Sequence, residues 1–142
     1  MAATAAATDI GFATTFGKVV SSTYTAFAEV TELGVPETSR DSVDFTHYGS
    51  PDRFREFKPG LSDAGEVTLT YNLVPGLADD AVIATHFATN AVETWRIVFP
   101  NGAKLEFSGF ATKHGRAAPM DDKMTGSATF KISGKPTLTP AA

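Results

Sequence analysis

The sequence predicts a mostly β fold, in which antiparallel strands form a small barrel or sandwich and one α-helix packs against it. Three observations lead to this prediction. Apolar and polar residues alternate with the period of a strand over residues 66–74 and 123–133. A Pro-Asn-Gly turn separates two further strand-like runs, at residues 94–99 and 104–112. Over residues 77–90 the apolar residues instead recur at spacings of three and four, which is typical of a helix.

The length and composition suit one domain spanning residues 1–142. The chain is 42% hydrophobic and contains 11 Phe, which is enough for a single core. It has no Cys, which excludes disulfides, thiolate metal sites and a Cys nucleophile. A net charge of -4 argues against a protein that grips nucleic acid through its phosphates. No run approaches the roughly 18 apolar residues of a membrane span, and the N-terminus lacks the basic start of a signal peptide. We therefore expect a soluble protein made in the cytoplasm.

The sequence of the first half of the chain predicts an N-terminal arm, two strands and a long loop, in that order. Residues 1–22 are rich in Ala, Thr and Ser, which are too small to pack as an element of their own, so we expect an N-terminal arm. Residues 24–33 alternate and stop before a Gly-Val-Pro sequence, which predicts a strand. A second, short strand is expected at residues 43–47. The long inter-strand loop then covers residues 48–65.

A strand and the only expected helix follow the loop. The apolar residues of the strand at 66–74 share one face: Val67, Leu69, Tyr71 and Leu73. A Pro-Gly pair ends this strand. The helix expected over residues 77–90 has Asp79 and Asp80 in its first turn, where acidic side chains complement the helix dipole.

The C-terminal part predicts a hairpin, a final strand and a tail. An Asn-Gly turn between residues 94–99 and 104–112 is the strongest short-range hairpin signal. In the strand at residues 123–133, one face carries Met124, Gly126, Ala128, Phe130 and Ile132. Residues 134–142 contain one Gly and two Pro, and we expect them to form a short C-terminal tail. The sum is about six or seven strands with one helix.

The sequence offers no credible catalytic, cofactor or metal site. His47, Ser50 and Asp52 are the residue types of a hydrolase triad, but neighbours in one loop rarely reach the required geometry. The segment 11–18 differs from a phosphate-binding loop in its glycine spacing, and Val19 stands where Ser or Thr would bind magnesium. The histidines lack the paired spacing of zinc ligands: His47, His86 and His114. We therefore expect neither an enzyme nor a cofactor.

The loop at residues 48–65 is the expected functional region. Most connections in compact domains are only about 4 to 6 residues long, so a loop of this size needs a reason. Charges and aromatic rings alternate in it, and aromatic residues and Arg are enriched at interface cores. A contact with another protein and a flap folded back on its own domain are equally compatible with this composition.

This loop resembles the major tail tube proteins of long-tailed, non-contractile bacteriophages, or of phage-like gene transfer agents. The shared order is a strand, Thr-His, Ser-Pro-Asp-Arg-Phe-Arg-Glu-Phe, Pro-Gly-Leu-Ser-Asp-Ala-Gly-Glu and another strand. The Gly-Leu-x-Asp-Ala-Gly-Glu run is the most specific part, and the resemblance spans roughly residues 24–133. The matching residues are Asp44, Thr46, Ser50, Pro51, Arg55, Glu56, Phe57, Gly60, Leu61, Asp63, Ala64, Gly65 and Glu66.

The resemblance implies a structural virion protein without catalysis, whose hexameric rings stack into a tube through which DNA passes. The implied partners are copies of itself and the tape-measure, tail terminator and distal tail proteins, with DNA only as a transient, non-specific cargo and no membrane. The implied location is the tail of a virion or phage-like particle, assembled in the host cytoplasm. The loop would contact an adjacent subunit through Tyr48, Arg53, Phe54, Arg55, Glu56, Phe57, Lys58, Leu61 and Asp63.

The resemblance also implies a channel surface, for which two polar strand faces are candidates. Their residues are Thr68, Thr70, Asn72, Thr125, Ser127 and Thr129. A hydrated channel without basic residues would let DNA slide, whereas a Lys-lined channel would hold it. Ordinary exposure to solvent accounts for these polar faces equally well. The two terminal arms would tie successive rings together.

Two other functions stay open at the level of sequence. A tail terminator or connector protein would form a single closed ring instead of an elongating stack. A β-sandwich module that binds carbohydrate or peptide would use exposed aromatic platforms, for which the candidates are Trp95, Tyr48 and Tyr71.

Overall fold

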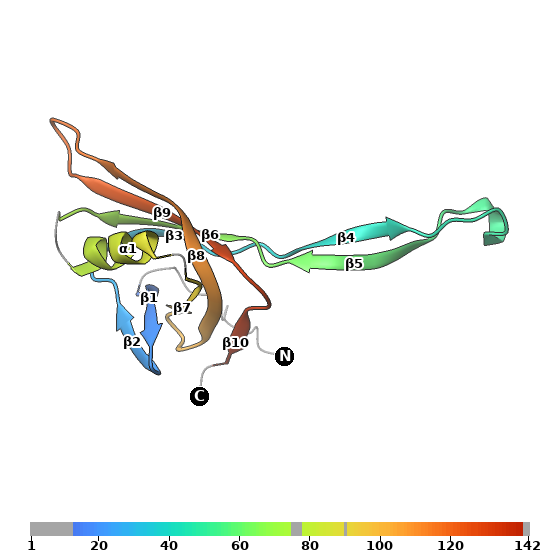
Figure 1. The fold of residues 1–142 in the computed structure, drawn as a ribbon, viewed down its shortest axis with the longest axis horizontal. Helices are drawn as coiled ribbons and strands as arrows, with labels where there is room; N and C mark the ends of the chain where they lie inside the picture. The colour runs from blue at the N-terminus through green and yellow to red at the C-terminus, as the bar shows by residue number, and fades with distance from the viewer. Residues whose placement is uncertain (1–12, 75–77, 90, 141–142) are drawn as a thin grey trace, which may run out of the picture.

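The computed structural model describes residues 13–74, 78–89 and 91–140, which form ten strands, one short 3-10 turn and one α-helix (Figure 1). The elements are β1 (Thr15–Val20), β2 (Thr23–Ala26), β3 (Val30–Gly34), β4 (Ser39–Asp44), η1 (Pro51–Arg53), β5 (Phe57–Asp63), β6 (Glu66–Asn72), α1 (Ala78–Ala88), β7 (Glu93–Val98), β8 (Lys104–Ala117), β9 (Thr125–Ile132) and β10 (Thr137–Thr139).

Eight strands form one antiparallel sheet that curls around the core. Seven of them follow the order β2-β1-β7-β8-β9-β6-β3, and β10 pairs with β8. The two end strands are consecutive in the chain, so the segment 27–29 joins opposite ends of the sheet. In this segment Phe27 donates its N–H to the carbonyl of Phe16, at 2.8 Å, and Glu29 accepts from the N–H of Asn72, at 2.9 Å. The predicted mostly β fold with an antiparallel sheet and one helix is confirmed.

Aromatic side chains make the centre of the core. The Phe16 ring stacks on Trp95 with centroids 5.7 Å apart, and Phe130 lies 4.5 Å from Trp95. Helix α1 covers this cluster with Ile83 and His86, both buried. Burying each large apolar side chain contributes roughly 1.5–3 kcal/mol, which is how this core holds the sheet without disulfides.

The strongly periodic elements lie where the sequence predicts them. The helix expected at 77–90 is α1, and the expected hairpin is β7 with β8, although β8 continues to Ala117. In β6 and β9 the predicted apolar faces are buried. These elements each bury one face, so their alternation is visible in the sequence.

Two predictions for the N-terminal part were wrong. The arm expected over residues 1–22 contains β1, whose Phe16 is completely buried against Trp95; residues 1–12 lie outside the described part. The single strand expected at 24–33 is divided into β2 and β3, because its middle residues bridge the two ends of the sheet.

The predictions for the loop and the tail also need correction. The loop expected at 48–65 contains β5, which pairs with β4 in a separate two-stranded sheet. The strand expected at 43–47 is β4, which begins earlier, at Ser39, and ends at Asp44. We call residues 39–63 the arm, and Figure 1 shows it extending away from the main sheet. In the tail expected at 134–142, β10 pairs with the start of β8.

Candidate functional site

A polar face runs across β6 and β9. The candidate channel residues lie directly opposite one another in three cross-strand pairs: Thr68 with Thr129, Thr70 with Ser127, and Asn72 with Thr125. They alternate with the buried residues of the same strands, so they lie on the face turned away from the core. The structure therefore brings all six predicted residues onto one face.

The polar face continues onto the neighbouring strands and ends at two edges that have no strand partner within residues 13–74, 78–89 and 91–140. Strand β3 is the last strand of the sheet on one side. On the other side, β7 begins at Glu93, which lies opposite Gly109 of β8. Residues 110–117 of β8 extend past this end of β7 and have no strand partner on that side in the described chain. An unpaired edge offers its N–H and C=O groups to another chain.

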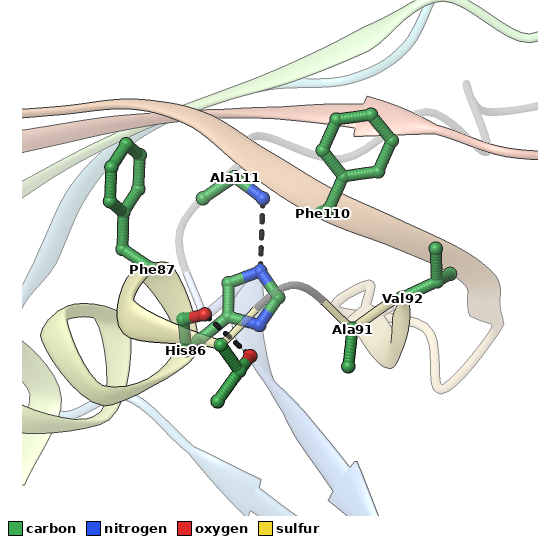
Figure 2. A pocket seen from close by; sticks show the side chains of 7 residues that line it. His86, Phe87, Ala91, Val92, Phe110 and Ala111 are labelled. Carbon is green, nitrogen blue, oxygen red and sulfur yellow. Dashed lines mark hydrogen bonds between the residues drawn. The ribbon is translucent and has the colours of Figure 1, made fainter.

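A largely apolar hollow of about 410 Å³ lies where β7 ends beside β8 (Figure 2). Phe87, Val92 and Phe110 line it and are each about half exposed. At its base, the backbone N–H of Ala111 donates to Nε2 of His86, at 2.9 Å. Because β7 does not extend to this point, His86 of helix α1 accepts the hydrogen bond from the Ala111 N–H in place of a strand carbonyl.

The buried His86 has both ring nitrogens occupied. Because Nε2 accepts a hydrogen bond, Nδ1 carries the proton and donates it to Glu93, at 2.9 Å. Burial raises the pKa of Glu93, but hydrogen bonding and the charge of Lys18, whose Nζ lies at 2.6 Å, outweigh burial and lower it. No lone pair of this histidine is left for proton transfer, so its role is to join α1, β7 and β8.

A second buried polar cluster joins the start of α1 to β8. Asp80 accepts two hydrogen bonds from Arg116, both at 3.0 Å, and one from the hydroxyl of Tyr71, at 3.2 Å. His114 lies 3.0 Å from the same hydroxyl. The hydrogen bond from Arg116 lowers the pKa of Asp80, whereas burial and then the charge of Asp80 raise the pKa of Tyr71 to about 12. Burial, followed by the charge of Arg116, lowers the pKa of His114.

The tip of the arm is organised by its own hydrogen bonds. His47 and Ser50 meet, but the Ser50 hydroxyl donates to Glu56, at 2.7 Å, and not to the histidine. The Nε2 atom of His47 faces the same carboxylate at 3.3 Å, because its Nδ1 accepts from the N–H of Gly49. Asp52 makes none of these contacts. The residue types of a hydrolase triad are therefore not arranged as a triad.

Large apolar side chains are exposed along the arm. Tyr48 and Leu61 are nearly free of contacts, and Phe54 and Phe57 are more than half exposed. Both faces of this two-stranded sheet are open to solvent, and such hairpins are marginal in water unless something packs against them.

Some of the nine predicted interface residues already have partners within the chain. Lys58 lies over the ring of Phe45, 4.8 Å from its centroid. Asp63 forms an ion pair with Lys131 at 2.9 Å, and a hydrogen bond from Gly65 followed by this ion pair lowers the pKa of Asp63. These contacts fix the arm and its base, whereas Tyr48, Phe54 and Arg55 stay exposed.

Other candidate sites find no support in the described residues. Trp95 and Tyr71 are buried, as their places in the strand alternation predict, so two of the three aromatic platforms of the alternative binding module are inaccessible; of the three, only Tyr48 is exposed. Within residues 13–74, 78–89 and 91–140, no three His, Asp or Glu side chains gather as metal ligands. The one described helix is too short to cross a membrane.

The part of the chain that the structure describes thus carries two strand edges without a strand partner, a polar face and an arm with exposed aromatic residues. The chain belongs to the lambda phage tail tube protein family, whose sequence profile matches residues 10–139. It is accordingly a tail tube subunit, and its place is the tail of a virion or a phage-like particle. No curated protein sequence matches the chain.

Solved structures of tail and tube proteins share the fold. A chain from the tail of an empty gene transfer agent particle has a TM-score of 0.78 at 13% identity, covering 94% of this chain and 100% of that one. The SPP1 tail tube gives a TM-score of 0.66 at 14% identity, covering 88% and 74%. The tube-terminating cap of the anti-feeding prophage gives 0.75 at 12% identity, covering 99% and 97%.

Proposed function

We propose that this chain is the major tail tube subunit and that six copies form a ring, with rings stacking into a hollow tube. Family membership and the polar face bounded by two unpaired edges carry the proposal. The tail of the similar gene transfer agent particle is described with C6 symmetry, which supports the ring number. The tube acts as a conduit and has no catalytic role.

In the proposed ring, the polar face of β6 and β9 lines the channel. Its centre carries hydroxyl and amide groups. Lys113 and Lys131 also lie on this face, but Lys131 lies opposite Glu66 and forms an ion pair with Asp63, so the described face lacks the run of unpaired basic side chains that binds phosphates tightly. DNA would therefore pass as transient, non-specific cargo. The polar face suits the wall of the channel, because it is not buried in the core and because its strands lie between two edges that are free to pair with neighbouring copies.

Ring closure follows from the direction of the strands. Strand β3 runs antiparallel to β6, β6 to β9, and β9 to β8, so β3 and β8 run in opposite directions. In a ring all copies point the same way along the axis, so β3 of one copy meets the free part of β8 in the next copy as an antiparallel pair. Six such junctions join the sheets into one continuous barrel.

The arm supplies the contact with an adjacent subunit outside the barrel. Exposed side chains on it include Tyr48, Phe54, Arg55, Phe57 and Leu61. Covering them in a neighbour would remove an unusual amount of apolar surface from water. Tape-measure, tail terminator and distal tail proteins would meet the ends or the interior of the finished tube.

Electron microscopy of negatively stained protein over a range of concentrations, alongside light scattering, tests this function. The wild-type protein should form long hollow tubes with a regular axial repeat. Phe57→Ala and Arg55→Ala should keep the melting temperature of the monomer but abolish tubes, because both side chains are exposed in the monomer. Leu138→Ala, an equally exposed apolar residue on β10, is the matched control and should assemble normally.

Two outcomes would contradict parts of this proposal. Normal tubes from Phe57→Ala and Arg55→Ala would mean that the arm is not the interface. Single closed rings at every concentration would point to a terminator, a role that the same fold serves in the anti-feeding prophage cap.

A further inference from the structure

The arm and the tip of the β8–β9 hairpin lie at opposite ends of the main sheet. The arm connects β3 to β6 at the end where β6 begins, with Glu66, and β9 finishes, with Ile132. At the other end, β8 and β9 are joined by residues 118–124, which we call the hairpin tip. Figure 1 shows the two elements pointing away from each other. From Ser39 to Asp52 the arm is up to about 40 Å long, at about 3.3 Å per extended residue, so its outer part projects well beyond the sheet.

Stacking of rings brings these two elements together. In the proposed ring all copies point the same way along the axis, and the strands of a barrel run from one rim to the other. One rim therefore carries the arms and the other rim carries the hairpin tips. A tube grows by repeating one head-to-tail contact, so the arms of one ring face the hairpin tips of the next ring.

The hairpin tip exposes two methionines and two carboxylates. Met120 is 101% exposed and Met124 is 39% exposed. Asp121 and Asp122 are both exposed, and neither forms an ion pair with another residue in the described parts of the chain. Methionine packs adaptably and makes favourable contacts with aromatic rings. The tip therefore suits a partner that offers aromatic and basic side chains.

The outer part of the arm offers those side chains. Residues 53–58 contain three basic residues and one acidic residue. Arg53 and Arg55 are exposed, and no ion pair joins either of them to another described residue. Beside them, Phe54 and Phe57 are more than half exposed. This stretch is complementary to the hairpin tip in both charge and apolar character.

Two of the three acidic side chains near these arginines are already engaged within the arm. Glu56 accepts a hydrogen bond from the Ser50 hydroxyl, at 2.7 Å. Asp44 accepts one from the backbone N–H of Thr46, at 2.8 Å. Asp52 alone makes no such contact with the described residues, so basic side chains outnumber free carboxylates in the outer part of the arm.

We propose that the hairpin tip of each copy docks on the outer part of an arm that reaches it from the next ring. The carboxylates of the tip pair with Arg55, and Met120 packs against Phe57. The inference rests on the proposed tube, and it names the surface on the partner copy that receives the arm. Because each copy has one arm and one tip, the contact repeats from ring to ring without closing, and the tube elongates.

A charge exchange tests the docking. Asp121→Arg and Arg55→Asp should each form rings but no tubes, and each monomer should keep its melting temperature because both side chains are exposed. The double variant, Asp121→Arg with Arg55→Asp, should recover tubes. Lys123→Glu is the matched control, because it reverses a charge in the same tip but makes the tip more acidic, so its tubes should form normally. Negative-stain electron microscopy distinguishes the rings from the tubes.

The outcomes separate this inference from the proposed function. Tubes from either single variant, no recovery in the double variant, or loss of tubes from Lys123→Glu would overturn the docking. The tube function would stand in each of these cases, provided that the wild type forms tubes. A wild-type protein that forms no tubes at any concentration would contradict the proposed function, and the docking with it.

Chemical cross-linking tests the same contact without changing its charges, because the chain has no Cys. Ser42 lies on the same face of the arm as Phe57, and Ala118 lies in the hairpin tip; both Ser42 and Ala118 are exposed. Tubes of Ser42→Cys with Ala118→Cys, treated with a flexible bis-maleimide, should give a ladder of products that continues beyond six copies, because each copy is joined to the rings on both sides. A ladder that stops at six would place the contact inside one ring and would overturn the docking.

The matched control for the cross-link is Ser42→Cys with Leu138→Cys. Leu138 is 62% exposed but lies on β10, at the end of the sheet that carries the arm, so it faces away from the arms that reach the hairpin tips. The control should give no product larger than six copies. Equal ladders from the two pairs would also overturn the docking.

Discussion

Replacing Gly126 with Ala should destabilise the monomer strongly, although the change adds only one methyl group. Gly126 lies in β9 directly opposite Tyr71 in β6, and the tyrosine ring covers it. A Cβ atom at this position would lie 2.3 Å from Cζ of Tyr71 and 2.6 Å from its hydroxyl oxygen. Real carbon contacts are longer than 3.0 Å, so the ring must move.

The expected loss of unfolding free energy is about 3–5 kcal/mol. Forcing an extra methyl group into a packed core costs about 1–3 kcal/mol. Moving the ring also breaks the hydrogen bond from the Tyr71 hydroxyl to the ionised, buried Asp80, and hydrogen bonds to charged groups contribute about 1.5–3 kcal/mol. Tyr71 is only 1% exposed, so the surrounding core leaves it little room to relax.

Equilibrium unfolding in urea measures this loss, and a second glycine provides the control. Gly115→Ala places its Cβ 3.3 Å from Oγ of Ser127, a side chain that can rotate, so its effect should stay within about 0.5 kcal/mol. In a Tyr71→Ala background, Gly126→Ala should cost under about 1 kcal/mol because the clash is gone. Equal losses for the two glycine variants, or the full loss without the ring, would refute the reasoning.

Three further predictions concern a turn, a buried histidine and a buried carboxylate. Changing Ser21-Ser22 to Asn-Gly should raise the unfolding free energy by about 1 kcal/mol and the melting temperature with it, because both serines have positive φ values (50° and 66°) in a two-residue turn. An unchanged or lower melting temperature would count against this prediction. His86→Leu should cost about 2–4 kcal/mol in urea unfolding, since a backbone N–H of β8 and Glu93 lose their partner; a cost below about 1 kcal/mol would contradict that role. Because the pKa of Asp80 is lowered in the folded protein, its contribution to the unfolding free energy is complete above the ordinary pKa of 3.8 and is lost as the pH falls below that value. The unfolding free energy of the wild type should therefore drop more steeply with falling pH than that of Asp80→Asn. Equal dependences on pH would argue against the ion pair.

The sequence allows the body of the fold to be predicted because each of its main elements buries one face. In β6, β9 and α1, burial imposes a period of two or of three to four on the apolar residues. The polar face was predictable for the same reason, because its residues are the polar positions that alternate with the buried ones in β6 and β9. The strands beside this face, β3 and β8, could not be predicted, because the order of strands in a sheet depends on contacts between distant segments.

The arm was not predictable as a hairpin because neither of its faces is buried. Every residue of β4 is exposed, so no alternation marks it, and β5 contains Pro59 and Gly60, which are uncommon in strands. Strand β1 was hidden for a different reason: Phe16 is its only large aromatic side chain, and the strand depends on pairing with β7. The hollow depends on where β7 ends beside β8, which no local pattern reveals.

The most direct test of the tube account is a helical reconstruction of assembled tubes by electron cryomicroscopy. The account predicts rings of six copies, with Thr68, Thr70, Ser127 and Thr129 facing the channel and with β3 of each copy beside residues 110–117 of the next. A tube whose channel is lined by α1, or whose neighbouring sheets are not joined through β3 and β8, would contradict it.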